Sequence, residues 1–102
     1  MKEKIISFNE PTRKGKKYSV KIKNNKTHKI HTINFGAIGY QQFKDRTPLK
    51  LYSNLNHDDK QRQKNYYRRF SGTTNRREAI AIEKKKSKGY YNAKILSHEY
   101  LW

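Results

Sequence analysis

The stretch KYSVKIKNNKTHKIHTINF, residues 17–35, decides the fold class. Its first seven residues alternate strictly, with Tyr18, Val20 and Ile22 on one side and polar residues on the other, which is the period of a half-buried strand. NNKT has the composition of a turn, and the run that follows is rich in β-branched residues and places an Ile and a Phe on one face. The sequence therefore predicts a β-hairpin over residues 17–35.

Residues 1–17 precede the hairpin and hold a short apolar run, then Pro11 and the basic segment TRKGKK. We interpret them as a basic N-terminal arm, with an edge strand as the alternative. Neither the hydrophobic region of a signal peptide nor a run approaching the roughly 18 apolar residues of a membrane span is present. The chain is therefore expected to be a protein that is not secreted and has no membrane partner.

The segment after the hairpin begins with FGAIGY, whose two glycines indicate tight turning. It lacks the Lys-Ser/Thr pair of a phosphate-binding loop and the spacing of a dinucleotide fingerprint. Further along, Pro48 bars a helix interior, and Leu49 with Leu51 predicts a third short strand.

HDDKQRQKNYYRRF, residues 57–70, has the charge pattern of a helix. Asn56 is a candidate N-cap, Asp58 and Asp59 would lie in the first turn, two arginines in the last, and Gly72 would stop the helix. Helical spacing would also pair Asp58 with Arg62, and would pair the rings of Tyr66 and Phe70.

A second helix is predicted to start at Asn75, with Glu78 as its capping-box partner, and to run through AIAIEKKK. Gly89 separates it from YYNAKILSHEYLW, whose apolar residues recur at helical spacing and imply that Leu101 and Trp102 are docked on the body. Residues 18–102 are therefore predicted to form one small α+β domain, an N-terminal β-hairpin or three-stranded sheet packed against two or three helices.

The charge of the chain restricts its partners. It has 25 Lys and Arg against 8 Asp and Glu, a formal net charge of +17, and no cysteine. A polyanion would relieve this self-repulsion, and nucleic acid is the simplest one, since each neutralised phosphate releases a counterion. Disulfides and thiolate metal sites are excluded.

The two predicted helices carry the basic residues that we expect to contact phosphates without strong sequence preference. These are Lys60, Arg62, Lys64, Arg68, Arg69, Arg76, Arg77, Lys84, Lys85 and Lys86. The aromatic residues among them, Tyr66, Tyr67 and Phe70, are interpreted as the buried stripe of the first helix rather than as a platform for base stacking.

No catalytic residue, metal site or cofactor is predicted. His28 and His31 would point to opposite faces of a strand. His57, Asp58 and Asp59, with Glu83 and Lys85, have the residue types of a metal-dependent nuclease, but helix position and solvation account for them. The prediction is that the chain is not an enzyme.

Two spaced motifs give the chain a family resemblance over about half of its length. FGAIGYQQF supplies the residues of the first, and the second keeps an unbroken His-x-Asp-x-x-Arg-x-x-x-Tyr-x-x-Arg spacing. In order, the matching residues are Phe35, Gly36, Ala37, Gly39, Tyr40, Phe43, His57, Asp59, Arg62, Tyr66 and Arg69. In these positions the chain resembles a family of small basic proteins of large double-stranded DNA viruses and some tailed phages. It departs from the family at Phe70, where the family has His, and in a longer segment before its Leu-Trp.

The resemblance implies a virion-associated structural protein, present in the virion and, during assembly, in the host cytoplasm or nucleus. Together with the charge, it leads us to expect non-specific binding of the viral genome, as double-stranded DNA, through the basic helices. One alternative is a minor capsid protein, whose cations meet acidic surfaces of other virion proteins. A second is a ribosomal or other RNA-associated protein. Phe35, Gly36, Ala37, Gly39, Tyr40, His57, Asp59 and Tyr66 are expected to have structural roles.

Overall fold

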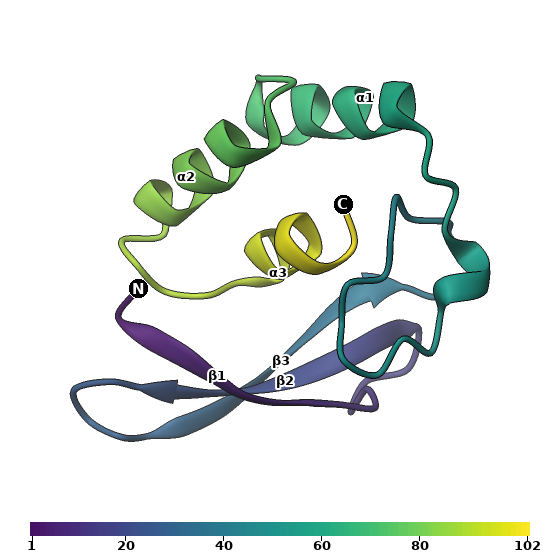
Figure 1. Cartoon of the computed structure of the whole chain (residues 1–102). Helices are drawn as coiled ribbons and strands as arrows, with labels where there is room; N and C mark the ends of the chain where they lie inside the picture. Colours follow the sequence, from purple (N-terminus) through teal and green to yellow (C-terminus); the bar gives the residue numbers. More distant parts are fainter.

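The fold has three layers (Figure 1). A computed structural model describes all 102 residues. A three-stranded sheet forms the base, helix α3 (Ala93–Tyr100) lies on one face of it, and helices α1 (Lys60–Ser71) and α2 (Arg76–Lys86) lie beyond α3. The predicted small α+β domain is confirmed.

The sheet is antiparallel, with the strand order β1 (Glu3–Asn9), β2 (Lys16–Asn24), β3 (Ile30–Ala37). The β2–β3 pair is the predicted hairpin, with Tyr18 opposite Phe35. The interpretation of residues 1–17 as an arm gives way to the alternative, because residues 3–9 form an edge strand. Its apolar residues Ile5 and Phe8 pack against the core, and this packing stabilises the strand.

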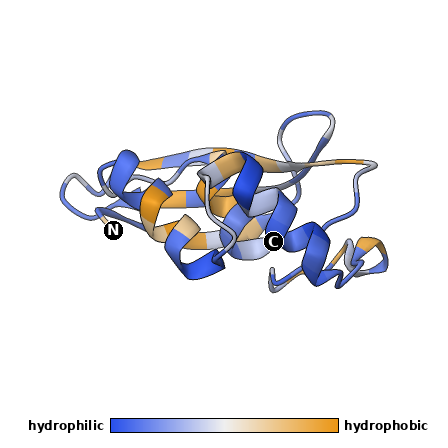
Figure 2. Cartoon of the chain, turned by 90° about the horizontal axis from the view of Figure 1, so that it is seen from above, coloured by the Kyte–Doolittle hydropathy of each residue, from blue (hydrophilic) through white to orange (hydrophobic).

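The core lies between the sheet and α3. Its fully buried members are Tyr18, Val20, Ile22, Phe35, Leu96 and Leu101. Hydrophobic residues gather in the middle of the molecule, whereas the hairpin turns are hydrophilic (Figure 2). Leu101 is 2% exposed, so the predicted docking of the last apolar residues is confirmed.

The long connection between β3 and α1 contains no strand, so the predicted third strand at Leu49 and Leu51 is wrong. Lys50 has a left-handed backbone (φ +50), which interrupts extended structure, and the Leu51 N–H donates to the Tyr18 hydroxyl at 2.8 Å instead of to a strand. The buried Asp45 carboxylate holds this connection together, since it accepts from the hydroxyls of Tyr18 (2.5 Å) and Thr47 (2.6 Å). A single 3-10 turn, Ser53–Leu55, follows.

Helix α1 begins later than predicted. Asp58 has φ +51 and lies outside the helix, so it forms no helical pair with Arg62. The N-cap is Asp59, whose side chain accepts from the N–H groups of Gln61 and Arg62, rather than Asn56. The helix ends at the left-handed Gly72, as predicted.

Helix α2 begins where the sequence predicts, and the Asn75 side chain caps it by accepting from the Glu78 N–H at 2.9 Å. The reciprocal half of the predicted capping box is wrong, because the Asn75 N–H donates to Thr73 Oγ1 at 3.3 Å instead of to the Glu78 carboxylate. None of the three helices combines the length and the apolar character needed to cross a membrane.

Candidate nucleic-acid interface

Helix α1 presents an outward row of basic side chains. Lys60, Lys64 and Arg68 are four residues apart, so they lie on one face over about 12 Å of helix axis. All three are exposed, and their side chains make no hydrogen bond or ion pair within the chain. This row is free to contact an anion.

Helix α2 is mixed. Arg77 and Lys85 are exposed and unpaired, and Lys86 lies 3.9 Å from the Glu83 carboxylate. Lys84 and Arg76 instead bind α3, because the Lys84 ammonium pairs with the Glu99 carboxylate at 2.7 Å and Arg76 donates to the Glu99 carbonyl at 2.9 Å. Of the predicted phosphate contacts, these two are engaged in helix packing.

The acidic residues are largely used inside the protein, so they do not neutralise its surface. Asp45 and Glu83 are buried, and Asp59 caps α1. Only three of the 25 Lys and Arg side chains form an ion pair with a carboxylate, namely Lys84, Lys86 and Lys94. Most of the excess positive charge is therefore exposed to solvent and to partners.

The second group of predicted residues surrounds a cleft between α1 and the segment that follows β3. The cleft has a volume of about 620 Å³. One wall is the α1 face at helical spacing, the other is the end of β3 and the following turn, and the C-terminal residues lie between them. In that order the principal lining residues are Arg62, Asn65, Tyr66, Arg69, Phe70, Gly36, Ala37, Tyr40, Gln41, Leu101 and Trp102.

Both motifs of the resemblance thus meet at one place. Gly36 and Tyr40 from the first face Arg62, Tyr66 and Arg69 from the second. Gly36 permits this approach, since its φ is +78 and an added Cβ would lie 2.9 Å from Leu101 Cδ1. No other residue type would allow the β3 end and the C-terminal segment to lie so close.

A buried lysine lies behind the β3 wall. Lys17 is 2% exposed, and its ammonium donates to the Tyr40 carbonyl at 2.6 Å and to Gln42 Oε1. Burial lowers the pKa of Lys17 to about 8, against the opposing effect of Asp45. The carbonyl bond fixes the backbone of Tyr40, and so the position of its ring at the mouth of the cleft.

The inner wall is aromatic. Tyr66 stacks on Trp102 with ring centroids 4.2 Å apart and an interplanar angle of 2°. The Tyr66 hydroxyl bonds His98 Nδ1 at 2.9 Å, and burial raises the pKa of Tyr66. The predicted aromatic stripe is half right: Tyr67 is fully buried and Tyr66 largely so, whereas Phe70 is 41% exposed.

His57 and Asp59 orient the start of α1 beside this wall. The His57 ring lies between Phe43 and Trp102, with centroids at 6.0 and 5.2 Å, and its Nδ1 accepts from the Asp59 N–H. Burial lowers the pKa of His57, and the nearby Arg62 adds to this effect. Both residues therefore act on the position of α1.

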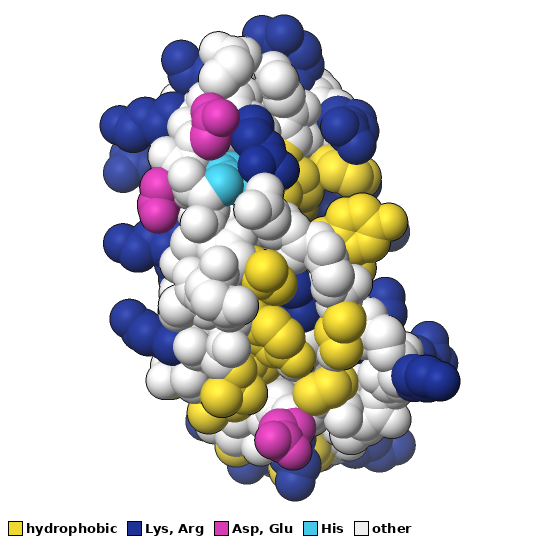
Figure 3. All heavy atoms as spheres, turned by 90° about the vertical axis from the view of Figure 1, so that its right-hand side faces the viewer, with side chains coloured by type: hydrophobic (Ala, Val, Ile, Leu, Met, Phe, Trp, Pro, Cys, Tyr) yellow, Lys and Arg dark blue, Asp and Glu magenta, His cyan; other side chains and the backbone are white.

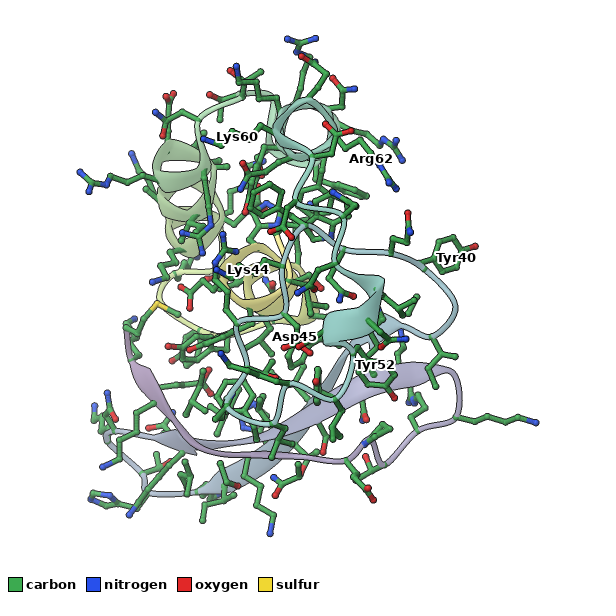
Figure 4. The ribbon with its side chains drawn as sticks, turned by 45° about the vertical axis from the view of Figure 1, so that its right-hand side comes forward. Tyr40, Lys44, Asp45, Tyr52, Lys60 and Arg62 are labelled. Carbon is green, nitrogen blue, oxygen red and sulfur yellow. The ribbon has the colours of Figure 1, made fainter.

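The rim of the cleft is basic and aromatic. Arg62 donates to Gln41 Oε1 at 2.8 Å, and the Arg69 guanidinium lies 5.7 Å from the Phe70 ring centroid. Tyr40 is 72% exposed and points away from the body on the same side as Arg62 (Figure 4). None of the residues that line the cleft is acidic.

Sequence reasoning did not find Lys17, Gln41, Asn65 or Trp102 as parts of a site. Asn65 could have been found from the helical spacing of Arg62, Tyr66 and Arg69, which share a face with it. Lys17 and Trp102 come from opposite ends of the chain, and no local pattern joins them to α1.

The residues of the alternative nuclease site have separate structural roles. Asp59 caps α1, while Glu83 on α2 accepts from Ser71 Oγ at 2.9 Å. Ser71 Oγ also lies 2.8 Å from His98 Nε2. Since the single hydroxyl proton of Ser71 is donated to Glu83, His98 must donate here, and it cannot serve as the base for this hydroxyl.

No group of three or more His, Cys, Asp or Glu side chains is placed to hold a metal ion. His28 lies in the hairpin turn with φ +61, and the His31 ring lies 3.6 Å from the Glu3 carboxylate. No protein-family model matches the chain, and it matches neither a curated protein nor a solved structure.

Proposed function

We propose that this chain is a virion-associated structural protein that binds the viral genome without strong sequence preference, through the basic surface of α1 and α2. The observation that carries the proposal is that almost all of its cations lack an internal carboxylate partner. Each such cation that meets a phosphate releases a counterion, which favours binding of nucleic acid. No ion pair within the protein has to break for this contact to form.

The α1 row gives the proposed contact a defined place. Lys60, Lys64 and Arg68 are held at a regular spacing of about 6 Å by the helix. Lys and Arg contacts of this kind position a protein on a phosphate backbone but read no base. The virion setting rests on the motif resemblance, while the binding rests on charge.

Fluorescence anisotropy with labelled duplex DNA across a salt series tests the proposal. A variant carrying Lys60→Gln, Lys64→Gln and Arg68→Gln should bind more weakly, and its log-log salt slope should become shallower by about 0.9 for each lost phosphate contact. The matched control is Lys21→Gln, Lys26→Gln and Lys29→Gln, which removes the same charge from exposed sites on the hairpin.

The control variant should keep most of the affinity and of the salt slope. A flat, weak response of the unmodified protein at low salt would overturn the proposal. Equal losses in the two variants would show that overall charge acts without a defined surface. Folded RNA that binds more tightly than the duplex would favour the RNA-associated alternative.

A second candidate function, a minor capsid protein, is favoured by an apolar patch. Ile38, Tyr40, Leu49 and Leu51 are 39–72% exposed and come from one connection. Hydrophobic side chains gather on the face of the molecule that this connection occupies (Figure 3). Such a patch with basic surroundings suits an apolar protein surface with an acidic rim. A protein of this kind would show little salt-dependent DNA binding in the assay above.

A further inference from the structure

We propose that the cleft between α1 and the segment following β3 binds an unpaired nucleotide of single-stranded nucleic acid. The inference rests on the proposed function and deepens it: the outer α1 row meets phosphates of any strand, whereas the cleft selects strands whose bases are free.

The charge of the cleft selects an anion. Arg62 and Arg69 lie two turns apart on the α1 wall, about 10 Å along the helix axis. No carboxylate lines the cleft to compete for them. A strand that runs along this wall can bring neighbouring phosphates to both guanidinium groups.

The aromatic residues select a planar group beside that anion. Tyr40 and Phe70 stand at the rim with 72% and 41% of their surfaces exposed, although burial in the core would be favourable for both. Tyr66 and Trp102 already stack on each other and form a flat inner wall. Bases stack on such rings without regard to sequence.

Two amides complete the lining. Gln41 Oε1 accepts from Arg62, and Asn65 Oδ1 accepts from Gln61 at 3.0 Å. The side-chain N–H groups of Gln41 and Asn65 have no partner within the chain, so they can donate to base or phosphate oxygens. A volume of about 620 Å³ lies within the usual range of small-molecule sites, and a paired base has no exposed face to insert.

Trp102 provides a direct probe, because it is the single tryptophan of the chain and lines the cleft. We would titrate the protein with a short oligothymidylate and with a blunt duplex of equal charge, following both anisotropy and Trp102 fluorescence. The oligothymidylate should quench Trp102, while the duplex should raise the anisotropy with little quenching.

Tyr40→Ala should weaken oligothymidylate binding on the order of tenfold, the effect of losing one stacking platform, and leave duplex binding unchanged. Tyr40→Phe keeps the ring and should restore binding. Tyr90→Ala is the matched control, since Tyr90 is 42% exposed and lies outside the cleft.

The outcomes separate the two proposals. Equal binding of strand and duplex without quenching would overturn the cleft assignment and leave genome binding intact. Failure of both nucleic acids to bind at low salt would overturn both. Quenching by polyglutamate as strong as by the oligothymidylate would assign the cleft to an acidic protein segment instead.

Discussion

Gly36 is the residue on which the meeting of the two motifs depends. It lies in a left-handed conformation, and the space where a Cβ would stand is bounded by Leu101 Cδ1 at 2.9 Å and Lys17 Cβ at 3.1 Å. Its neighbour Gly39 has a similar φ of +87 but open space around it. Glycine is therefore required at position 36 by both its backbone conformation and its close neighbours, and at position 39 by its backbone conformation alone.

Gly36→Ala should destabilise the protein by at least about 2 kcal/mol, from backbone strain together with overpacking. Gly39→Ala should cost only the strain, about 1 kcal/mol. Urea unfolding of both variants measures the difference. Equal losses would mean that Leu101 and Lys17 move aside without cost, and that the close approach is not required.

At the scale of elements, a chain of buried and partly buried polar groups joins the three helices. Tyr66 on α1 bonds His98 on α3, His98 bonds Ser71 at the end of α1, and Ser71 bonds Glu83 on α2. Lys94 on α3 approaches Glu83 to 3.6 Å. Both ring nitrogens of His98 are hydrogen-bonded, and the burial of the ring disfavours its charged form.

The network predicts how stability depends on pH. Burial lowers the pKa of His98 from 6.5 to about 4, with Glu83 opposing the shift. The unfolded chain therefore binds a proton that the folded chain does not, so stability is full above about pH 6.5 and falls as the pH drops toward 4. The loss should reach at most about 3 kcal/mol.

Urea unfolding between these pH values checks the prediction. His98→Gln should flatten the part of the profile above pH 5, whereas His31→Gln, at a half-exposed ring, should leave it unchanged. Burial also lowers the pKa of His57, so His57 contributes to the slope that remains in His98→Gln. An unaltered slope in His98→Gln would contradict the role of the network.

The elements that could be predicted are those with local causes. The β2–β3 alternation, the Asn75 cap and the Gly72 stop depend on neighbours within a few residues. The start of α1 could not be predicted, because the N–H groups of His57 and Asp58 bond the carbonyls of Gln42 and Phe43 and fix the preceding backbone. The false strand at Leu49 and Leu51 has a similar cause, the long-range bond to Tyr18.

The candidate site divides in the same way. The cations of α1 and α2 could be predicted from composition and spacing, because the exposure of a charged side chain does not depend on contacts with distant residues. The cleft could not, because it requires β2, β3, α1 and the C-terminal residues to converge. The motif spacing indicated that Arg62 and Tyr66 belong together but not what lies opposite them.

At the scale of the whole molecule, the net charge of +17 is spread over a body of 41 × 28 × 20 Å. The Debye length is about 30 Å at 0.01 M salt and about 8 Å at 0.15 M. Repulsion between cations on opposite sides therefore acts at low salt and is screened at physiological salt.

The free energy of unfolding should rise as sodium chloride is added over this range. The rise should be smaller in the variant with Lys60→Gln, Lys64→Gln and Arg68→Gln, which carries less charge. Thermal or urea unfolding at fixed pH measures both. Stability that stays constant or falls with salt would mean that the cations do not oppose folding.

The position of α3 has a consequence for how the protein forms. The middle layer is contributed by residues 93–100, after both outer layers have been synthesised. Until α3 arrives, the sheet and the α1–α2 pair each have an uncovered apolar face and no third element to bury it. Folding should therefore occur in one cooperative step once α3 has left the ribosome, with no stable intermediate on the way.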